Sequence, residues 1–221
     1  MMQSSFGSTQ FSIDHIERIP VFPLPGALLL PGGQLPLNIF EPRYLRMVDD
    51  ALGAARLIGM IQPRTGSTEG TPPLYGVGCA GRITSFTETE DGRYLITLTG
   101  LMRFDLKDEP EVDTPYRQAT VDISRFRSDR QTDPSAEIVD RERLVEAMQV
   151  YLDAEGLKTD WEAVEAAPTE ALVASLAMGC PFAPNEKQAL LEATTAKDRA
   201  ECLVALMEMA RNEGGSNENL Q

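Results

Sequence analysis

Apolar residues occupy every second position in much of the first half of the chain. The alternation is clear in residues 35–40, 94–99 and 118–123. A period of two places alternate side chains on one face of an extended chain, so these segments are predicted strands. Asp91 and Gly92 lie between two strand-like segments, and an Asp-Gly pair predicts a tight hairpin turn because glycine readily adopts positive φ.

The second half of the chain has helical spacing instead. After Asp129 the apolar residues recur every three or four positions. Segments with this spacing begin near Asp133, Trp161, Pro168, Asn185 and Thr195. One further helix, residues 42–52, is expected among the strands. Strands followed by helices, without regular alternation, predict an α+β fold in two parts.

These patterns divide the chain into four segments. We expect a polar mobile tail at residues 1–14, a β-barrel subdomain at 15–130, a helical subdomain at 131–212 and a second mobile tail at 213–221. Several glycines lie inside the predicted strands, and interior glycine permits the bulges and sharp coiling that a small closed barrel needs.

Composition and charge narrow the class of protein. The chain of 221 residues is 42% hydrophobic and 24% charged, as in ordinary globular proteins. Residues 1–130 have a net charge of −3, and residues 131–221 have −11. Acidic surface repels nucleic acid and anionic membranes, so neither is an expected partner. The sequence has no apolar run near the 20 residues of a membrane span and no secretory leader, so we expect a cytoplasmic protein.

The familiar catalytic patterns are missing from the sequence. It has no GxxxxGK[ST] phosphate loop and no GxSxG nucleophile turn. The single histidine, His15, rules out most forms of a histidine-dependent triad or a multi-histidine metal site. Cys79, Cys180 and Cys202 are predicted to be small buried apolar residues. We therefore expect no catalytic residue, no metal and no cofactor.

A proline-rich segment, residues 20–44, is the most distinctive part of the sequence. Its central leucines have two interpretations: they pack back onto the barrel as a lid, or they form an exposed apolar surface for extended polypeptide. Glu41 and Tyr44 add a charge and an aromatic ring at a helix N-terminus. The candidate polypeptide-binding residues are Leu24, Leu28, Leu29, Leu30, Leu35, Glu41 and Tyr44.

The same segment resembles the start of the Lon protease N-terminal (substrate-binding) domain. The resemblance continues through GVGCAGRI (residues 76–83), DGRYLITLTG (residues 91–100) and Arg103-Phe104. Late helical residues also match the family: Gln188, Leu190, Leu191, Glu192 and Arg199. The resemblance implies a PUA-like six-stranded β-pseudobarrel with one inserted helix, followed by an α-helical bundle. It implies recognition and not proteolysis, because the family's ATPase and Ser–Lys protease domains have no counterpart in this sequence.

The leading hypothesis is a non-catalytic, stand-alone recognition module. It would bind unfolded or damaged polypeptide, or dock onto a separate protease or chaperone. The alternative is an RNA-binding PUA-like module, which the net negative charge of the barrel half disfavours. A cryptic hydrolase lacks an assembled nucleophile and base. Small-molecule binding on the barrel surface, by analogy with a related eukaryotic protein, is a further alternative. The oligomeric state is left open.

Overall fold

The computed structural model describes residues 16–64 and 71–217, with side chains up to residue 210. Its six strands are β1 (Arg18–Pro23), β2 (Gln34–Ile39), β3 (Leu57–Ile61), β4 (Val77–Glu88), β5 (Tyr94–Asp108) and β6 (Gln118–Asp122). The predicted tail at residues 1–14 and His15 lie outside the described residues.

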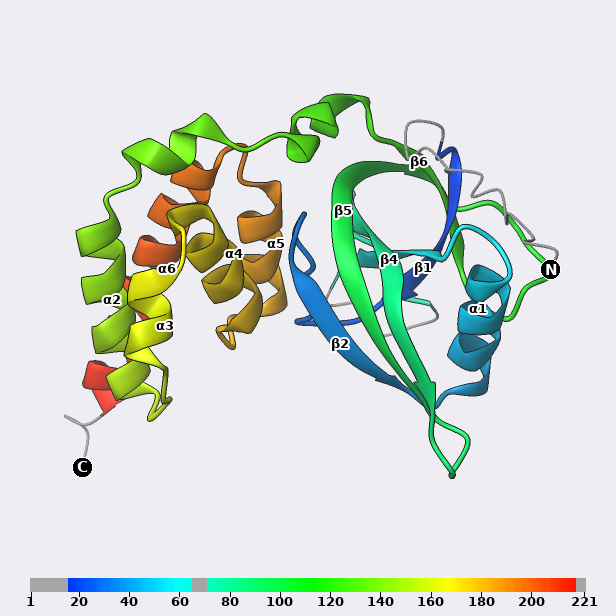
Figure 1. The fold of residues 1–221 in the computed structure, drawn as a ribbon, viewed down its shortest axis with the longest axis horizontal. Coiled ribbons are helices and arrows are strands. Elements are labelled where there is room, and N and C mark those ends of the chain that lie inside the picture. Colours follow the sequence, from blue (N-terminus) through cyan, green and yellow to red (C-terminus); the bar gives the residue numbers. More distant parts are fainter. Residues whose placement is uncertain (1–15, 65–70, 218–221) are drawn as a thin grey trace, which may run out of the picture.

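The strands form one mixed sheet that closes into a ring (Figure 1). The order is β2-β5-β4-β3-β1-β6, and an additional pairing between β5 and β6 closes the barrel. Among these six strands of the described residues, β1 and β3 pair in parallel and the other pairs are antiparallel. The predicted α+β class and six-stranded barrel are therefore confirmed.

Glycine allows the chain before β2 to lie directly against β5. The Gly32 N–H donates to the Gly100 carbonyl, and the Gly100 N–H donates to the Gly33 carbonyl, both at 2.9 Å. A Cβ atom on Gly100 would overlap the carbonyl oxygen of Leu30. Gly100 is thus needed because another backbone approaches closely, as expected for a glycine inside a strand.

The inserted helix α1 (Pro42–Leu52) begins at Pro42 and ends at Gly53, as predicted. It covers the side of the barrel away from the other α-helices (Figure 1). Its buried residues include Tyr44, whose ring packs on Phe22 with centroids 4.3 Å apart.

The helical half begins with two 3₁₀ segments, η2 (Ser124–Arg130) and η3 (Pro134–Ile138). The α-helices are α2 (Arg141–Ala154), α3 (Trp161–Ala166), α4 (Thr169–Gly179), α5 (Pro184–Glu192) and α6 (Ala196–Asn217). They pack together beside the barrel, with η2 and η3 passing over the gap (Figure 1).

The first helical segment, predicted to begin near Asp133, is divided in the structure: Asp133 caps only the short η3, and α2 begins after Asp140, whose side chain accepts from the Arg143 N–H at 3.1 Å. The last helix, α6, begins next to Thr195 as predicted, and the Oγ1 of Thr195 caps it by accepting from the Asp198 N–H at 3.0 Å. Helix α5 begins at Pro184, next to the predicted Asn185, and its capping side chain is Glu186, which accepts from the Ala183 N–H at 2.7 Å. Helix α6 also continues to Asn217, past the predicted start of the tail at residue 213. Extending a formed helix gains one hydrogen bond per residue, which offsets the roughly 1 kcal/mol cost of each glycine.

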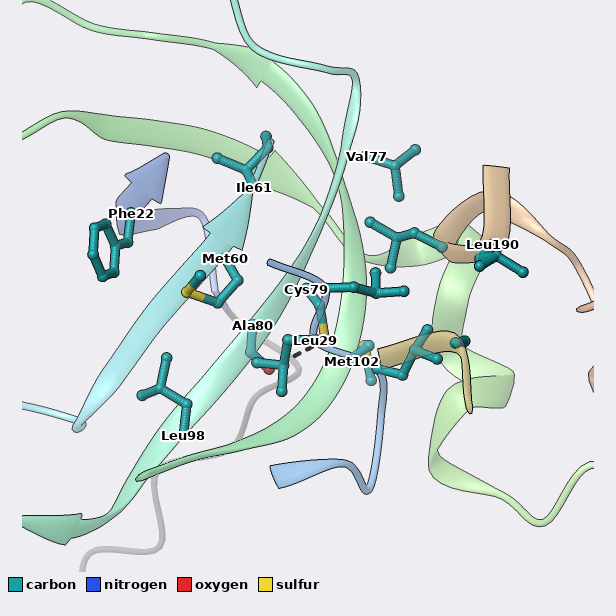
Figure 2. Packing of buried hydrophobic residues seen from close by; sticks show 14 of the residues in the cluster. Phe22, Leu29, Met60, Ile61, Val77, Cys79, Ala80, Leu98, Met102 and Leu190 are labelled. Atoms are coloured by element: carbon teal, nitrogen blue, oxygen red, sulfur yellow. Dashed lines mark hydrogen bonds between the residues drawn. The ribbon is translucent and has the colours of Figure 1, made fainter. Parts of the chain in front are cut away.

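The structure buries the central leucines of the proline-rich segment. Leu28, Leu29 and Leu30 are only 2%, 1% and 1% exposed. Leu29 fits where Gly81 and Gly100 leave the sheet without side chains, and it packs among the residues of Figure 2. The alternative that made these leucines an exposed binding surface is therefore wrong. Their apolar side chains are worth roughly 1.5–3 kcal/mol each when removed from water.

The burial of the three cysteines agrees only in part with the prediction. Cys79 and Cys180 are buried as predicted, whereas Cys202 is only half-buried. Burial raises the pKa of the Cys79 thiol to about 12 and also raises the pKa of the Cys180 thiol. Both thiols are therefore protonated near neutral pH, and a protonated thiol is a poor nucleophile.

Candidate functional site

A groove of about 840 Å³ lies between the barrel and the helical half. One wall is the start of β2, the opposite wall is α4, and the end of η2 with the residues after it completes the lining. Apolar and small residues dominate the two walls: Leu35, Pro36, Ala171, Ala174, Ser175 and Met178. We call this site the junction groove.

The two walls of the junction groove touch at Gly33 and Met178. The side chain of Met178 reaches across from α4 and occupies the space where a Cβ on Gly33 would lie. Met178 is half-buried, so part of its flexible thioether remains accessible from the groove. Methionine adapts to irregular apolar surfaces, which suits a site that binds varied side chains.

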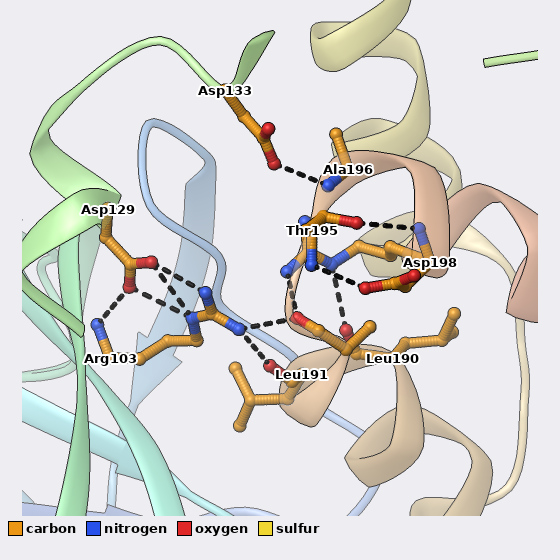
Figure 3. A network of polar contacts seen from close by, with 10 residues as sticks. Arg103, Asp129, Asp133, Leu190, Leu191, Thr195, Ala196 and Asp198 are labelled. Carbon is orange, nitrogen blue, oxygen red and sulfur yellow. Dashed lines mark hydrogen bonds and ion pairs between the residues drawn. The ribbon is translucent and has the colours of Figure 1, made fainter. Parts of the chain in front are cut away.

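Buried Arg103 on β5 joins the barrel to the helical half (Figure 3). Its guanidinium pairs with Asp129 at 2.7 Å, and the two side chains are 6% and 5% exposed. Its Nη1 donates to the main-chain carbonyls of Leu191 and Ala193, at 3.0 and 2.7 Å. The guanidinium also lies over the ring of Phe126 at 4.8 Å. Arg103 therefore connects β5, η2 and the C-terminus of α5.

A second arginine binds the same end of α5. Arg199 donates from Nε to the Leu190 carbonyl at 2.9 Å and from Nη2 to the Ala193 carbonyl at 3.1 Å. Cations are favourable at a helix C-terminus, where unpaired carbonyls carry partial negative charge. Burial is the main cause that lowers the pKa of Arg199, to about 10. Asp133 completes the network by accepting from the Ala196 N–H at 2.6 Å.

Two glutamines attach α5 to the barrel at other points. Gln62 accepts from the Gly26 N–H and donates to the Pro184 carbonyl, both at 2.9 Å. Gln188 donates to the Val77 carbonyl on β4 at 3.1 Å. These contacts, with those of Arg103, make α5 the element through which the helical half is held to the barrel.

The structure separates the residues that we predicted to form one binding surface. Leu35 lines the junction groove. Leu24 is half-buried at the end of β1, where its N–H donates to the Ile61 carbonyl at 3.2 Å. Glu41 and Tyr44 lie past the other end of β2, roughly 20 Å along a six-residue strand. There Glu41 pairs with an arginine on α1 at 2.7 Å, and Tyr44 is buried.

The sequence interpretation missed the α4 wall of the groove and the Arg103 network. Arg103 stands inside an apolar strand, and Gln62 follows the fully buried strand β3. A polar residue in such a place has to find a partner in the interior, which is the one signal that identifies both residues. Met178, Ala174 and Ala171 carry no comparable signal, because their helix is apolar on several sides.

A buried lysine stabilises the helix that forms the groove wall. Lys187 Nζ donates to the carbonyls of Ala177 and Met178 at the C-terminus of α4, at 2.8 and 2.7 Å. Burial lowers the pKa of this ammonium group to about 8. In the unfolded chain its pKa returns to the ordinary value of 10.5, so the unfolded state binds more protons between these two values.

Because of Lys187, the free energy of unfolding should therefore increase as the pH rises from 7.5 to 9.5. We expect the wild type to gain about 1–2 kcal/mol relative to Lys187→Met over this range, measured by urea unfolding. Lys158→Met, at an exposed position, is the control variant measured over the same range. Equal pH profiles for wild type and Lys187→Met would contradict the assignment.

Residues 18–209 match the model of the ATP-dependent protease La (LON) substrate-binding domain. This chain belongs to that family. Among curated relatives, Lon protease 2 of Myxococcus xanthus is 26% identical over 87% of this chain and 24% of its own length. Lon protease of Roseiflexus castenholzii is 27% identical over 92% of this chain and 25% of its own length. The Lon-family chain thus spans about a quarter of these proteases, and no ATPase or protease domain is matched.

Solved structures of the family share the fold. A Lon N-terminal domain protein from Xanthomonas campestris has 24% identity and a TM-score of 0.58, covering 86% of this chain and 98% of its own. The N-terminal domain of Mycobacterium avium complex Lon protease has 16% identity and a TM-score of 0.61 over the same shares. Within residues 16–64 and 71–217, no helix of this Lon-family domain is long and apolar enough to cross a membrane.

Proposed function

We propose that this protein is a non-catalytic recognition module that binds unfolded or extended polypeptide in the junction groove. The observation that carries the proposal is the groove itself, an accessible apolar hollow of about 840 Å³ between two rigid elements. Ligand sites are commonly concave, largely apolar and located between structural units. Membership of the Lon substrate-binding family supports a polypeptide as the ligand.

The chemistry of the groove walls suits polypeptide side chains. Leu35 and Ala174 are half-buried, and Met178 can adjust its conformation to different shapes. Each apolar side chain that a client buries there contributes roughly 1.5–3 kcal/mol before ordering costs. Two or three such contacts correspond to weak, reversible capture, as a module that meets many different clients requires.

Charge adds a preference among clients. Glu170 lines the groove, and residues 131–221 carry a net charge of −11. Complementary charge accelerates encounter and disfavours like-charged partners. We therefore propose that clients with basic residues flanking an apolar stretch bind better than acidic ones, and that raising the salt concentration reduces this difference.

Filling the groove tests the proposal. Ser175 is exposed on the α4 wall, so Ser175→Trp should occupy the groove without removing a core contact. We expect at least tenfold weaker binding of a fluorescent, permanently unfolded model polypeptide, measured by anisotropy. Ala205→Trp, at an exposed position of α6 outside the groove, is the matched control and should bind as the wild type does. Equal affinity of Ser175→Trp and the control would place the site elsewhere, and absence of binding by all three proteins would refute a polypeptide-binding role.

A further inference from the structure

Strand β2 is an edge strand beside the junction groove. Among the described residues it pairs only with β5, so its other edge has no strand partner. It begins on the side of the helical half and runs toward α1 (Figure 1). Its first three residues, Gln34–Pro36 in the sequence, line the groove opposite α4. An edge strand presents unpaired main-chain groups that can pair with another extended chain.

The hydrogen-bond pattern shows which groups face that edge. In an antiparallel pair, successive residues point their N–H and C=O groups alternately toward and away from the neighbouring strand. The Gly100 N–H donates to the Gly33 carbonyl at 2.9 Å, so the odd-numbered residues of β2 face β5. The residues whose main chain faces the free edge are Gln34, Pro36 and Asn38. Proline tolerates this position because the ladder with β5 needs no donor there.

Apolar side chains continue from the groove along this edge. A second hollow of about 350 Å³ lies on the outer face of β2, β5 and β4, and Pro36 lines both it and the junction groove. Leu95, opposite Asn38 on β5, is 45% exposed, and Phe40 just beyond β2 is 62% exposed. Large apolar side chains gathered on one exposed face mark an interaction surface.

We propose that an extended polypeptide segment binds as an additional strand on the free edge of β2, with its apolar side chains toward Leu95 and Phe40. This inference rests on the proposed function and specifies how the same site recognises its ligand. The N–H groups of Gln34 and Asn38 donate to the segment, and the carbonyls of Gln34, Pro36 and Asn38 accept from it. Because main-chain groups are common to all sequences, this mode recognises extended conformation more than sequence.

The occupant is a foreign segment and not β2 of a second copy. Two β2 edges paired with each other would both lack the donor at Pro36, which weakens a ladder of only six residues. The net charge of −14 also makes two copies repel one another. Pro36 thus protects the edge against self-association while two donors remain for a flexible client.

A proline at Asn38 tests the role of the protein's main chain. Asn38→Pro removes one edge-facing N–H at a position equivalent to Pro36, two residues away, and leaves the ladder with β5 intact. We expect at least fivefold weaker binding of a peptide with alternating valine and threonine and basic ends. Asn38→Thr, which keeps the N–H, is the matched control. Pro36→Thr restores a third donor and should tighten binding. Thermal unfolding should show that all three variants remain folded.

N-methylated peptides test the same contacts from the ligand side. Alternation of valine and threonine fixes which face the peptide presents, so its valine amides and threonine amides point to opposite edges. Methylating one set should reduce affinity at least tenfold, whereas methylating the other set should have little effect.

The outcomes separate this inference from the proposed function. If both methylated peptides and Asn38→Pro bind normally while Ser175→Trp still weakens binding, the groove captures side chains and strand addition is wrong. If neither Ser175→Trp nor Asn38→Pro weakens binding, both proposals are refuted. A concentration-dependent dimer of the wild type that Asn38→Pro abolishes, seen by sedimentation, would show that the edge serves self-association and would overturn the inference.

Discussion

Replacing Leu28 and Leu29 together by serine should destabilise the protein by about 5 kcal/mol or more, enough to unfold most of it. Both side chains are almost fully buried, at 2% and 1% exposure. Shortening a buried leucine typically costs about 2–5 kcal/mol, and the buried serine hydroxyls add a further penalty. Since domains of this kind are stable by only about 5–15 kcal/mol, the double substitution removes most of the free energy of unfolding.

The matched control is Phe40→Ser with Leu95→Ser, which removes two exposed apolar side chains from the same barrel. This pair should change the free energy of unfolding by less than about 1 kcal/mol, and it should weaken peptide binding if strand addition is correct. Circular dichroism with urea unfolding compares the two double variants. A melting temperature for Leu28→Ser with Leu29→Ser close to that of the wild type would show that these leucines are not core residues.

Arg103→Met is expected to destabilise the protein by about 3–5 kcal/mol. The substitution leaves Asp129 buried without its partner, and removing one member of a buried ion pair typically has this effect. It also removes the two donors to the carbonyls of Leu191 and Ala193 at the end of α5. Because α5 is held to the barrel partly through these bonds, we expect the loss to loosen the helical half and to widen the junction groove.

Arg125→Met is the control for this prediction. Arg125 also pairs with an aspartate, Asp105, at 2.6 Å, but its side chain is 60% exposed. Exposed ion pairs contribute about 0–1 kcal/mol, so this variant should unfold nearly as the wild type does. Urea unfolding measures both variants, and hydrogen exchange of the α5 amides reports whether the helical half loosens. Equal stability of the two variants would mean that Arg103 is not an essential contact between the halves.

The sequence by itself determined the elements and the class of fold. Alternation in residues 94–99, helical spacing after Asp129 and the Asp91-Gly92 turn all depend on local chain geometry, and the structure has β5, the late helices and the hairpin at these places. Local periodicity is readable because each side chain's face follows from its own position in a strand or helix. The resemblance to the Lon substrate-binding family was readable for the same reason, from contiguous motifs, and the family match confirms it.

Tertiary structure alone decided which apolar residues are buried. Leu28, Leu29 and Leu35 stand in one proline-rich segment, and local pattern gave no reason to separate them. Gly81 and Gly100, more than fifty residues away, leave the space that Leu29 fills, so its burial depends on a contact that the chain makes only when folded. Leu35 is only half-buried because it lines the junction groove, whereas Ile39 on the same strand is buried in the core.

The candidate site was likewise beyond the sequence. The junction groove lies between β2 and α4, which are about 140 residues apart, and the two halves that form it are joined by Arg103, Asp129 and the carbonyls at the end of α5. A main-chain carbonyl is the same group at every position, so the residue type does not indicate which carbonyl will accept a hydrogen bond from a distant arginine. Local chemistry determined what each segment becomes, and only long-range packing decided where the segments meet and leave a groove.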